Sequence, residues 1–340
     1  MRNNRTYSII TVVLGLLWLH LSAIAQQPVK HWFKGNVHAH TVNSDGDSTP
    51  LAVAEWYREH GYNFLAITDH NWLTDTENIN RVAGEAGKFL LLPGEEVTTT
   101  SVDKKEVHVN GIGINRLVPP STGKTVIELL QQNVDAIHES GGIASLNHPN
   151  YTWAIQSKEL IASRDLLLFE VFNASWSVGN AGGGGYESHE EMWDKALSAG
   201  KKIYGIASDD SHDFKQYGRA LPYPPTIPGG GWIVVRAEAL TQEHIVNALR
   251  RGDFYASTGV VLSDVQVDES AFTIHIRRTR DSEYRTEFIG KDGVVLSTST
   301  DVNPSYRLRG DEVYVRARVQ DSIGGVAWVQ PIFPARGKAK

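Results

Sequence analysis

Side chains that bind metal ions occur in short groups along this sequence, most of them directly after an apolar run. His38 and His40 are one residue apart, and Asp69 and His70 follow the apolar run that ends at Thr68. The complete set is His38, His40, Asp45, Asp69, His70, Glu95, Glu96, His108, His148, Asp209, Asp210 and His212. One such pair is usually a surface feature, but its repetition after successive apolar runs is hard to produce by chance. Imidazole and carboxylate groups together favour zinc, manganese or iron, so the sequence predicts a metal centre.

Composition limits the other chemistries. The chain has 340 residues and no cysteine, which excludes disulfides, thiolate zinc sites and cysteine nucleophiles. The formal net charge is -6, so there is no excess of basic side chains for gripping a long nucleic acid. The composition and net charge therefore favour a small-molecule substrate over a long nucleic acid. They do not specify an oligomeric state. The remaining histidines are interpreted as solvated or structural, with contact between His189 and the site left open.

The elements that must position these groups alternate between strands and helices. Strand-like apolar runs cover residues 63–68, 89–92, 107–114, 143–146, 166–172, 202–207 and 231–236. Helical patterns with Thr or Ser starts or Gly stops cover 49–59, 125–140, 187–199 and 241–251. This alternation predicts an α/β fold with a parallel sheet, most economically a distorted (β/α)7-type barrel over residues 26–262.

A barrel would bring the groups together. Carboxyl ends of parallel strands meet on one face, where catalytic side chains are found. Alternation along a strand puts His38 and His40 on the same side of it. Two long insertions, 173–186 with a run of four glycines and 216–231, are predicted to be functional or mobile loops. From residue 263 to 340, short alternating segments predict a small antiparallel β region.

The first 25 residues have the pattern of a secretory signal peptide. Arg2 and Arg5 precede an apolar stretch from Ile9 to Leu21, and a small-x-small motif ends at Ala25. An uncleaved N-terminal anchor is the alternative. No other stretch is long and apolar enough to cross a membrane, so the sequence predicts a periplasmic or secreted protein without stable membrane insertion after cleavage.

These motifs resemble the PHP family, named for its polymerase and histidinol phosphatase members. The resemblance covers residues 31 to 257, and within the family it looks most like the CehA/McbA-type metallohydrolases. The segments that carry it are Gly-Asn-Val-His-Ala-His-Thr at 35–41, Ile-Thr-Asp-His-Asn at 67–71, Ser-Asp-Asp-Ser-His at 208–212 and Gly-Asp-Phe-Tyr-Ala-Ser-Thr-Gly at 252–259.

The resemblance implies two or three divalent ions, zinc, manganese or iron, and assigns their ligands. It implies a first ion held by His38, His40, Glu96 and Asp210, a second held by Glu96, His108 and His148, and a third held by Asp45, His70 and His212. The family pattern selects Glu96 over Glu95 and Asp210 over Asp209. Asp69 and Asn147 are interpreted as residues that support the ligands.

The expected activity is hydrolysis of a phosphoester by a metal-activated water, because divalent ions suit a dianionic group. His212, Asp210 and His70 are expected to act at the reacting group, with Arg219 as a phosphate contact. Hydrolysis of a carboxylic or carbamic ester on the same centre is the alternative within enzymes. A different class remains open: a non-catalytic protein that binds a glycan or surface partner through Trp153, Trp176 and Trp232.

Overall fold

The computed structural model describes residues 29–101, 103–215, 224–279 and 281–334. The predicted signal peptide (residues 1–25) and Arg219 lie outside these ranges. Within them, no helix has the length and apolar character needed to cross a bilayer.

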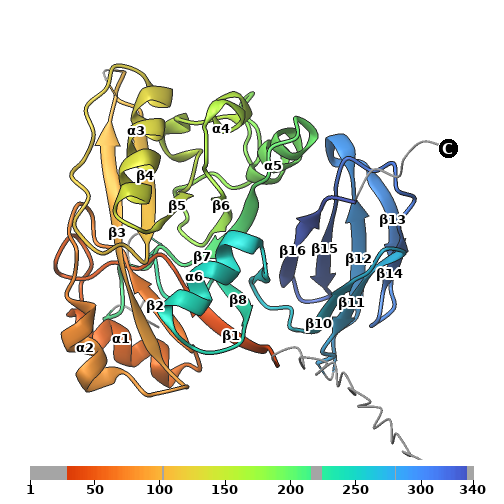
Figure 1. Ribbon diagram of the computed structural model, residues 1–340, viewed down its shortest axis with the longest axis horizontal. Coiled ribbons are helices and arrows are strands. Elements are labelled where there is room, and N and C mark those ends of the chain that lie inside the picture. Colours follow the sequence, from red (N-terminus) through yellow and green to blue (C-terminus); the bar gives the residue numbers. More distant parts are fainter. Residues whose placement is uncertain (1–28, 102, 216–223, 280, 335–340) are drawn as a thin grey trace, which may run out of the picture.

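Most of the described strands belong to one mixed sheet of 13 strands (Figure 1). Its order is β13-β12-β15-β16-β9-β8-β1-β2-β3-β4-β5-β6-β7. The first seven strands along the chain are β1 (His31–Asn36), β2 (Phe64–Ile67), β3 (Leu90–Thr100), β4 (Glu106–Ile112), β5 (Ile143–Leu146), β6 (Leu168–Asn173) and β7 (Tyr204–Ser208). The others in this sheet are β8 (Trp232–Ala237), β9 (Phe254–Ser257), β12 (Tyr284–Ile289), β13 (Val295–Ser299), β15 (Val315–Asp321) and β16 (Val326–Ile332).

The α/β class is confirmed, but the expectation of a parallel sheet is wrong for two strands of the N-terminal part. β4 runs antiparallel between β3 and β5, and β8 runs antiparallel to both β1 and β9. A closed barrel is not confirmed either. In the part of the chain that the structure describes, β7 lies next to β8 and β9 without a backbone ladder to either.

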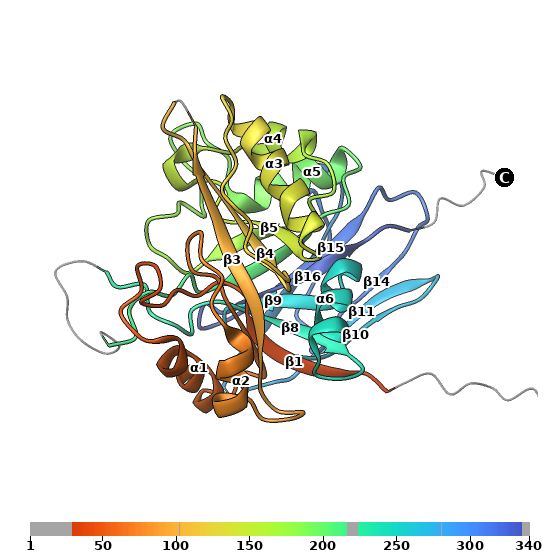
Figure 2. The same cartoon turned by 60° about the vertical axis from the view of Figure 1, so that its left-hand side comes forward.

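The helices lie in two groups at opposite ends of the N-terminal part, with α6 apart from both (Figure 2). They are α1 (Pro50–Glu59), α2 (Thr76–Ala83), α3 (Val126–Glu139), α4 (Ser157–Ala162), α5 (His189–Ser198) and α6 (Gln242–Arg251), with the 3-10 turns η1 (Tyr151–Trp153) and η2 (Lys291–Gly293). The predicted caps explain several ends. Thr125 and Glu128 form a capping box at α3, and Gly252 ends α6 with φ 75°.

The C-terminal strands form a region of their own beside the helices (Figure 1). β9 pairs with β16, so the large sheet continues through β16, β15, β12 and β13 with antiparallel pairs only. A second sheet of β10 (Leu262–Val267), β11 (Ala271–Ile276) and β14 (Ser305–Arg307) is antiparallel as well. The apolar faces of the two sheets share one core, in which Phe272 packs edge-on against Phe288 at 5.6 Å.

Candidate metal centre

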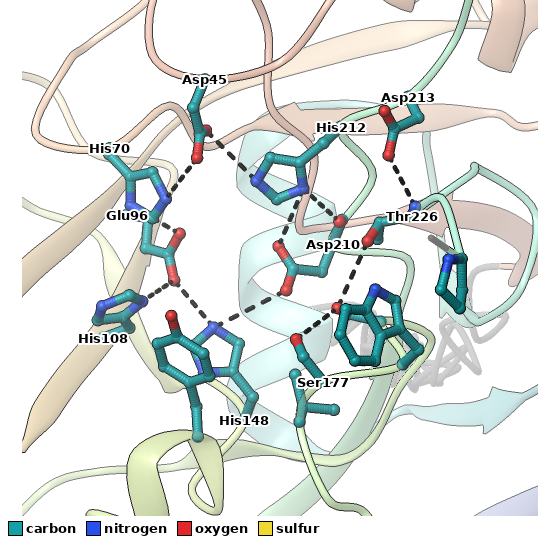
Figure 3. Close-up of a pocket in the computed structure, with 15 residues that line it drawn as sticks. Asp45, His70, Glu96, His108, His148, Ser177, Asp210, His212, Asp213 and Thr226 are labelled. Carbon is teal, nitrogen blue, oxygen red and sulfur yellow. Dashed lines mark hydrogen bonds and ion pairs between the residues drawn. The ribbon is translucent and has the colours of Figure 1, made fainter. Parts of the chain in front are cut away.

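The predicted metal-binding side chains gather where the parallel strands end. His38 and His40 follow β1, His70 follows β2 and His148 follows β5. Isolated bridges between Ala39 and Ser211 and between His70 and Glu96 hold these chain segments side by side. Figure 3 shows Glu96 facing His70, His108 and His148, with Asp210 opposite and Asp45 between His70 and His212.

Glu96 is the centre of this arrangement. It is fully buried in β3, and each of its carboxylate oxygens faces two or more imidazoles. Oε2 lies 3.3 Å from His38 Nε2, 3.2 Å from His40 Nε2 and 3.1 Å from His70 Nδ1; Oε1 lies 3.0 Å from His108 Nδ1 and 3.3 Å from His148 Nε2. A carboxylate shared in this way has the chemistry of a bridging ligand.

Asp210 forms the second carboxylate of the cluster. Its Oδ1 lies 3.1 Å from His38 Nε2 and 3.2 Å from His40 Nε2. The residue has φ 51°, a left-handed conformation that is unfavourable for a side chain other than glycine and concentrates at functional sites. A hydrogen bond of 3.0 Å from the Asp210 amide to the His38 carbonyl holds the backbone there.

Asp45 closes the outer side of the cluster. Its oxygens lie 3.3 Å from His212 Nε2 and 3.7 Å from His70 Nε2, and its side chain is 56% exposed. The loop that carries it is fixed by Asp69, which accepts hydrogen bonds from the Thr41 amide and the Ser44 hydroxyl. Asp45 therefore belongs to the most open part of the centre.

The donor set fits divalent cations. Three groups have ligand atoms within 4.8 Å of one another: His40, Asp45, His70 and His212; His38, Glu96, His148 and Asp210; and His70, Glu96 and His108. Four buried atoms of these groups, His38 Nε2, His40 Nε2, Glu96 Oε2 and His108 Nε2, make no hydrogen bond. Buried polar atoms without partners are rare because they cost stability, and cations bound within these groups would give such atoms a partner.

Electrostatics point in the same direction. Burial raises the pKa of Glu96, but the imidazoles of His38, His70 and His108 outweigh it and hold the pKa well below its usual range. Burial likewise raises the pKa of Asp210, and the nearby His38 and His40 outweigh it in the same way. Both carboxylates are therefore ionised near neutral pH, as metal ligands must be.

Glu96 and Asp210 each have an acidic neighbour in the sequence, and the side chains of these neighbours point away from the cluster. Glu95 is also buried, but its Oε2 accepts a hydrogen bond of 2.8 Å from the Val118 amide, and burial raises its pKa to about 7. Asp209 accepts hydrogen bonds from Tyr57 and from the amides of Gly230 and Gly231. Neither carboxylate lies in the three ligand groups, so the geometry separates each acidic pair into one residue inside and one outside the cluster.

The sequence reasoning missed Glu170, a fully buried carboxylate of β6 that accepts a 2.7 Å hydrogen bond from His38 Nδ1. The signal that could have found it is a single charged residue inside the apolar run 166–172. It also missed Asn173, whose amide donates to Asp210 Oδ2 at 3.2 Å. His189 is buried at the start of α5 and is absent from the three ligand groups.

A pocket of about 270 Å³ opens above the cluster. Its lining includes seven of the predicted ligands: Asp45, His70, Glu96, His108, His148, Asp210 and His212. The other lining residues are Tyr151, the segment 175–178, Asp213, Pro224 and Thr226. The four-glycine run is not part of this lining, so the insertion after β6 contributes its first residues to the pocket instead.

Comparisons with known proteins give distant likenesses. No family model matches the chain. It is 26% identical over 152 residues to an uncharacterized protein of Methanocaldococcus jannaschii. The aligned region covers 42% of this chain and 82% of that protein. The structure of this chain is similar to a Bacteroides vulgatus two-domain protein described as containing a predicted PHP-like metal-dependent phosphoesterase, with a TM-score of 0.49, 15% identity, and 91% and 94% of the two chains covered.

A second solved structure in this range is a lesion-specific endonuclease from Pyrococcus furiosus. It has a TM-score of 0.41 and 16% identity, and the match covers 65% of this chain and 56% of the endonuclease. Because both TM-scores are below 0.5, the side-chain geometry described above carries the functional conclusion.

Proposed function

We propose that this protein is a metal-dependent hydrolase of the PHP family that cleaves phosphoesters. The observation that carries the proposal is the buried Glu96 carboxylate at the base of a pocket, which faces five imidazoles and belongs to two of the three ligand groups. The family motifs in the sequence support the same assignment. The CehA/McbA type remains part of the proposal.

Divalent ions held by these residues supply Lewis acidity, which makes water nucleophilic near neutral pH and neutralises negative charge on the substrate. Glu96 and Asp210 place fixed negative charge at the base of the pocket. His70 and His212, which are about a quarter exposed, reach the pocket surface together with Asp45. Among the described residues, these two imidazoles are the best placed to donate a hydrogen bond to a non-bridging oxygen of the substrate or to its leaving group.

The charge of the pocket lining implies that an anionic substrate binds only when the ions are present. The described lining residues include four carboxylates, Asp45, Glu96, Asp210 and Asp213, and neither Lys nor Arg. Without cations this surface repels a phosphate, so binding and metal loading should be linked. A carboxylic or carbamic ester lacks that charge and is the alternative substrate class on the same centre.

The test is metal analysis of protein purified without chelator, followed by assays with aryl phosphates, phosphodiesters, aryl esters and carbamates. We expect bound zinc, manganese or iron and turnover of phosphoesters. The double variant His38→Ala/His40→Ala should lose turnover by several orders of magnitude while staying folded. His31→Ala, at the exposed start of β1, is the matched control.

The outcomes separate the three classes. If the protein hydrolyses aryl esters but not phosphoesters, the proposed phosphoesterase activity is wrong and the carboxylic-ester alternative takes its place. If the wild-type protein retains no divalent ion and hydrolyses none of the substrates, the hydrolase proposal is wrong, and the non-catalytic binding protein is the remaining class.

We also propose export, on the basis of the sequence pattern of residues 1–25. N-terminal sequencing of the protein recovered from the periplasm or medium should give a chain that begins at Gln26. Recovery of an intact N-terminus in the membrane fraction would support the uncleaved anchor instead.

A further inference from the structure

Glu170 is an ionisable side chain in the middle of an apolar strand. It lies in β6, where its neighbours Phe169 and Val171 belong to the core, and its side chain is fully buried. A buried carboxylate is costly unless its oxygens are all satisfied by donors. Its persistence here therefore calls for a specific set of partners.

Both oxygens of Glu170 are saturated by four donors. Oε1 accepts 2.7 Å and 2.5 Å hydrogen bonds from His38 Nδ1 and the Ser208 hydroxyl. Oε2 accepts 2.7 Å and 2.8 Å hydrogen bonds from the His148 amide and the Asn173 side chain. The donors come from four separate segments: the ends of β1, β5, β6 and β7.

Three of these four contacts lead to predicted metal ligands. His38 and His148 bond to Glu170 directly, and Asn173 passes the connection to Asp210 Oδ2 at 3.2 Å. Ser208 is two residues before Asp210 on the same segment. One carboxylate is thus connected to three members of a single ligand group with Glu96: to the His38 ring, to the backbone of His148 and, through Asn173, to Asp210.

The contact with His38 also determines which ring nitrogen faces the cluster. The Glu170 carboxylate accepts a hydrogen bond from Nδ1–H, so in the neutral imidazole, the form that binds a cation, Nε2 carries the lone pair. Nε2 is the atom that lies 3.3 Å from Glu96 and 3.1 Å from Asp210. Carboxylates in this position orient ligating imidazoles and increase their basicity, and their loss weakens metal binding.

We propose that Glu170 is a positioning residue of the metal centre: it holds the ring of His38 with Nε2 turned to the cation and aligns His148 and Asp210 with it. This proposal rests on the proposed metal-dependent function. Glu95 provides the contrast, since it is equally buried, but among the described residues its side chain accepts a hydrogen bond only from the Val118 amide, and it belongs to none of the ligand groups.

The experiment compares Glu170→Gln with Glu95→Gln, using Co²⁺ as the probe. Both variants replace a buried glutamate by its neutral isostere, so a general loss of packing affects both alike. Co²⁺ affinity and stoichiometry are measured by equilibrium dialysis, and the visible Co²⁺ absorption spectrum reports the ligand geometry. Thermal unfolding of the metal-free variants controls for stability.

We expect Glu170→Gln to bind at least one Co²⁺ roughly 10–100-fold more weakly than wild type, with an altered visible spectrum. Glu95→Gln should keep the wild-type affinity and spectrum. If Glu170→Gln does not fold, Glu170→Asp is measured instead, because it retains the charge and withdraws the oxygens from His38; a smaller loss in the same direction is expected.

Unchanged Co²⁺ affinity and spectrum in a folded Glu170 variant would overturn the positioning role while leaving the hydrolase intact. Equal losses in the Glu170 and Glu95 variants would overturn it as well, since they would indicate a general packing effect. A wild-type protein that binds no Co²⁺, Zn²⁺ or Mn²⁺ would remove the proposed function itself, so the two failures are distinguishable.

Discussion

At the scale of single residues, two buried histidines have pKa values shifted in opposite directions. His38 faces carboxylates: burial lowers its pKa, but Asp210, Glu96 and Glu170 outweigh this and raise the pKa well above its ordinary value. His189 lacks such compensation. Burial lowers its pKa from 6.5 to about 3, and the nearby Glu170 offsets only part of the shift.

His189 should make stability depend on pH. Between pH 6.5 and about 3 the unfolded chain binds a proton on this imidazole that the folded chain does not, so stability falls as the pH falls through this window. His189→Leu should remove that contribution, which reaches about 1.4 kcal/mol per pH unit. Urea unfolding of both proteins at pH 7, 6 and 5 measures it. Free-energy curves that stay parallel would contradict the expectation.

Residue types and spacing predict that these side chains converge, and the family resemblance selects the ligands among them, but neither indicates how the ligands are supported. The ligands follow apolar runs, and that position relative to a strand end can be read locally. Glu170 lies inside such a run, and the sequence does not say which face of β6 it occupies. Its four donors come from segments up to 132 residues away, so only the tertiary structure reveals its role.

At the scale of elements, strand positions were predicted more readily than strand directions. The run at 143–146 matches β5, and the run at 63–68 contains β2. The reversal of β4 was missed, although β3 and β4 are separated only by residues 101–105, too few for the crossover that parallel strands require. The reversal explains His108: it lies near the start of an antiparallel strand, at the same edge as the ends of the parallel ones.

β7 is the last strand of the sheet, and a side chain of β16, not a neighbouring strand, forms hydrogen bonds with its free edge. The Gln330 amide of β16 donates to the Gly205 carbonyl at 2.7 Å and accepts from the Gly205 amide at 2.9 Å. Gln330→Leu leaves both buried backbone groups without a partner and should destabilise the fold by about 1–3 kcal/mol. Chemical denaturation measures the loss. Gln320→Leu, at an exposed position of β15, should be near neutral, and equal effects would contradict this role.

The loop after β6 should influence substrate preference. Trp176 lines the pocket with 64% of its surface exposed, and its neighbours Ser175 and Ser177 are joined by a 3.2 Å hydrogen bond. Loss of a stacking surface in Trp176→Ala should raise KM for an aryl phosphate roughly 3–10-fold and leave KM for a small alkyl phosphate unchanged. Trp72→Ala is the control, since Trp72 is 53% exposed but outside the pocket lining. Equal KM changes for both substrates would contradict a stacking role.

At the scale of the whole molecule, several contacts bind the C-terminal strands to the rest of the chain. The large sheet passes from β9 into β16 without interruption. A buried ion pair then joins α5 to β15: Arg316 Nε lies 2.7 Å from Asp194 Oδ1, and Nη2 lies 2.7 Å from Oδ2. The sequence predicted an antiparallel region here, but the pairing of a distant arginine with α5 has no local signal.

The ion pair at this junction yields a prediction about cooperativity. Arg316 is buried, lies 5.0 Å from the Trp193 ring and is the charged partner of Asp194, which also accepts from the Tyr314 hydroxyl. Removing one member of a buried pair leaves the other charge uncompensated, so Arg316→Met should cost about 3–5 kcal/mol. Guanidinium unfolding followed by tryptophan fluorescence measures this loss.

Two further variants test the origin of that cost. Arg318 lies in the same strand as Arg316, is more exposed and pairs with Glu190 of α5. Arg318→Met should cost at most about 1 kcal/mol. Adding Asp194→Leu to Arg316→Met removes the stranded charge and should recover part of the stability. If the double variant is as unstable as the sum of both single ones, the arginine contributes through packing alone. The ion pair would then not be what couples α5 to the C-terminal sheet, and other contacts, such as the hydrogen bond from the Asp292 amide to the Ser198 hydroxyl, would carry that coupling.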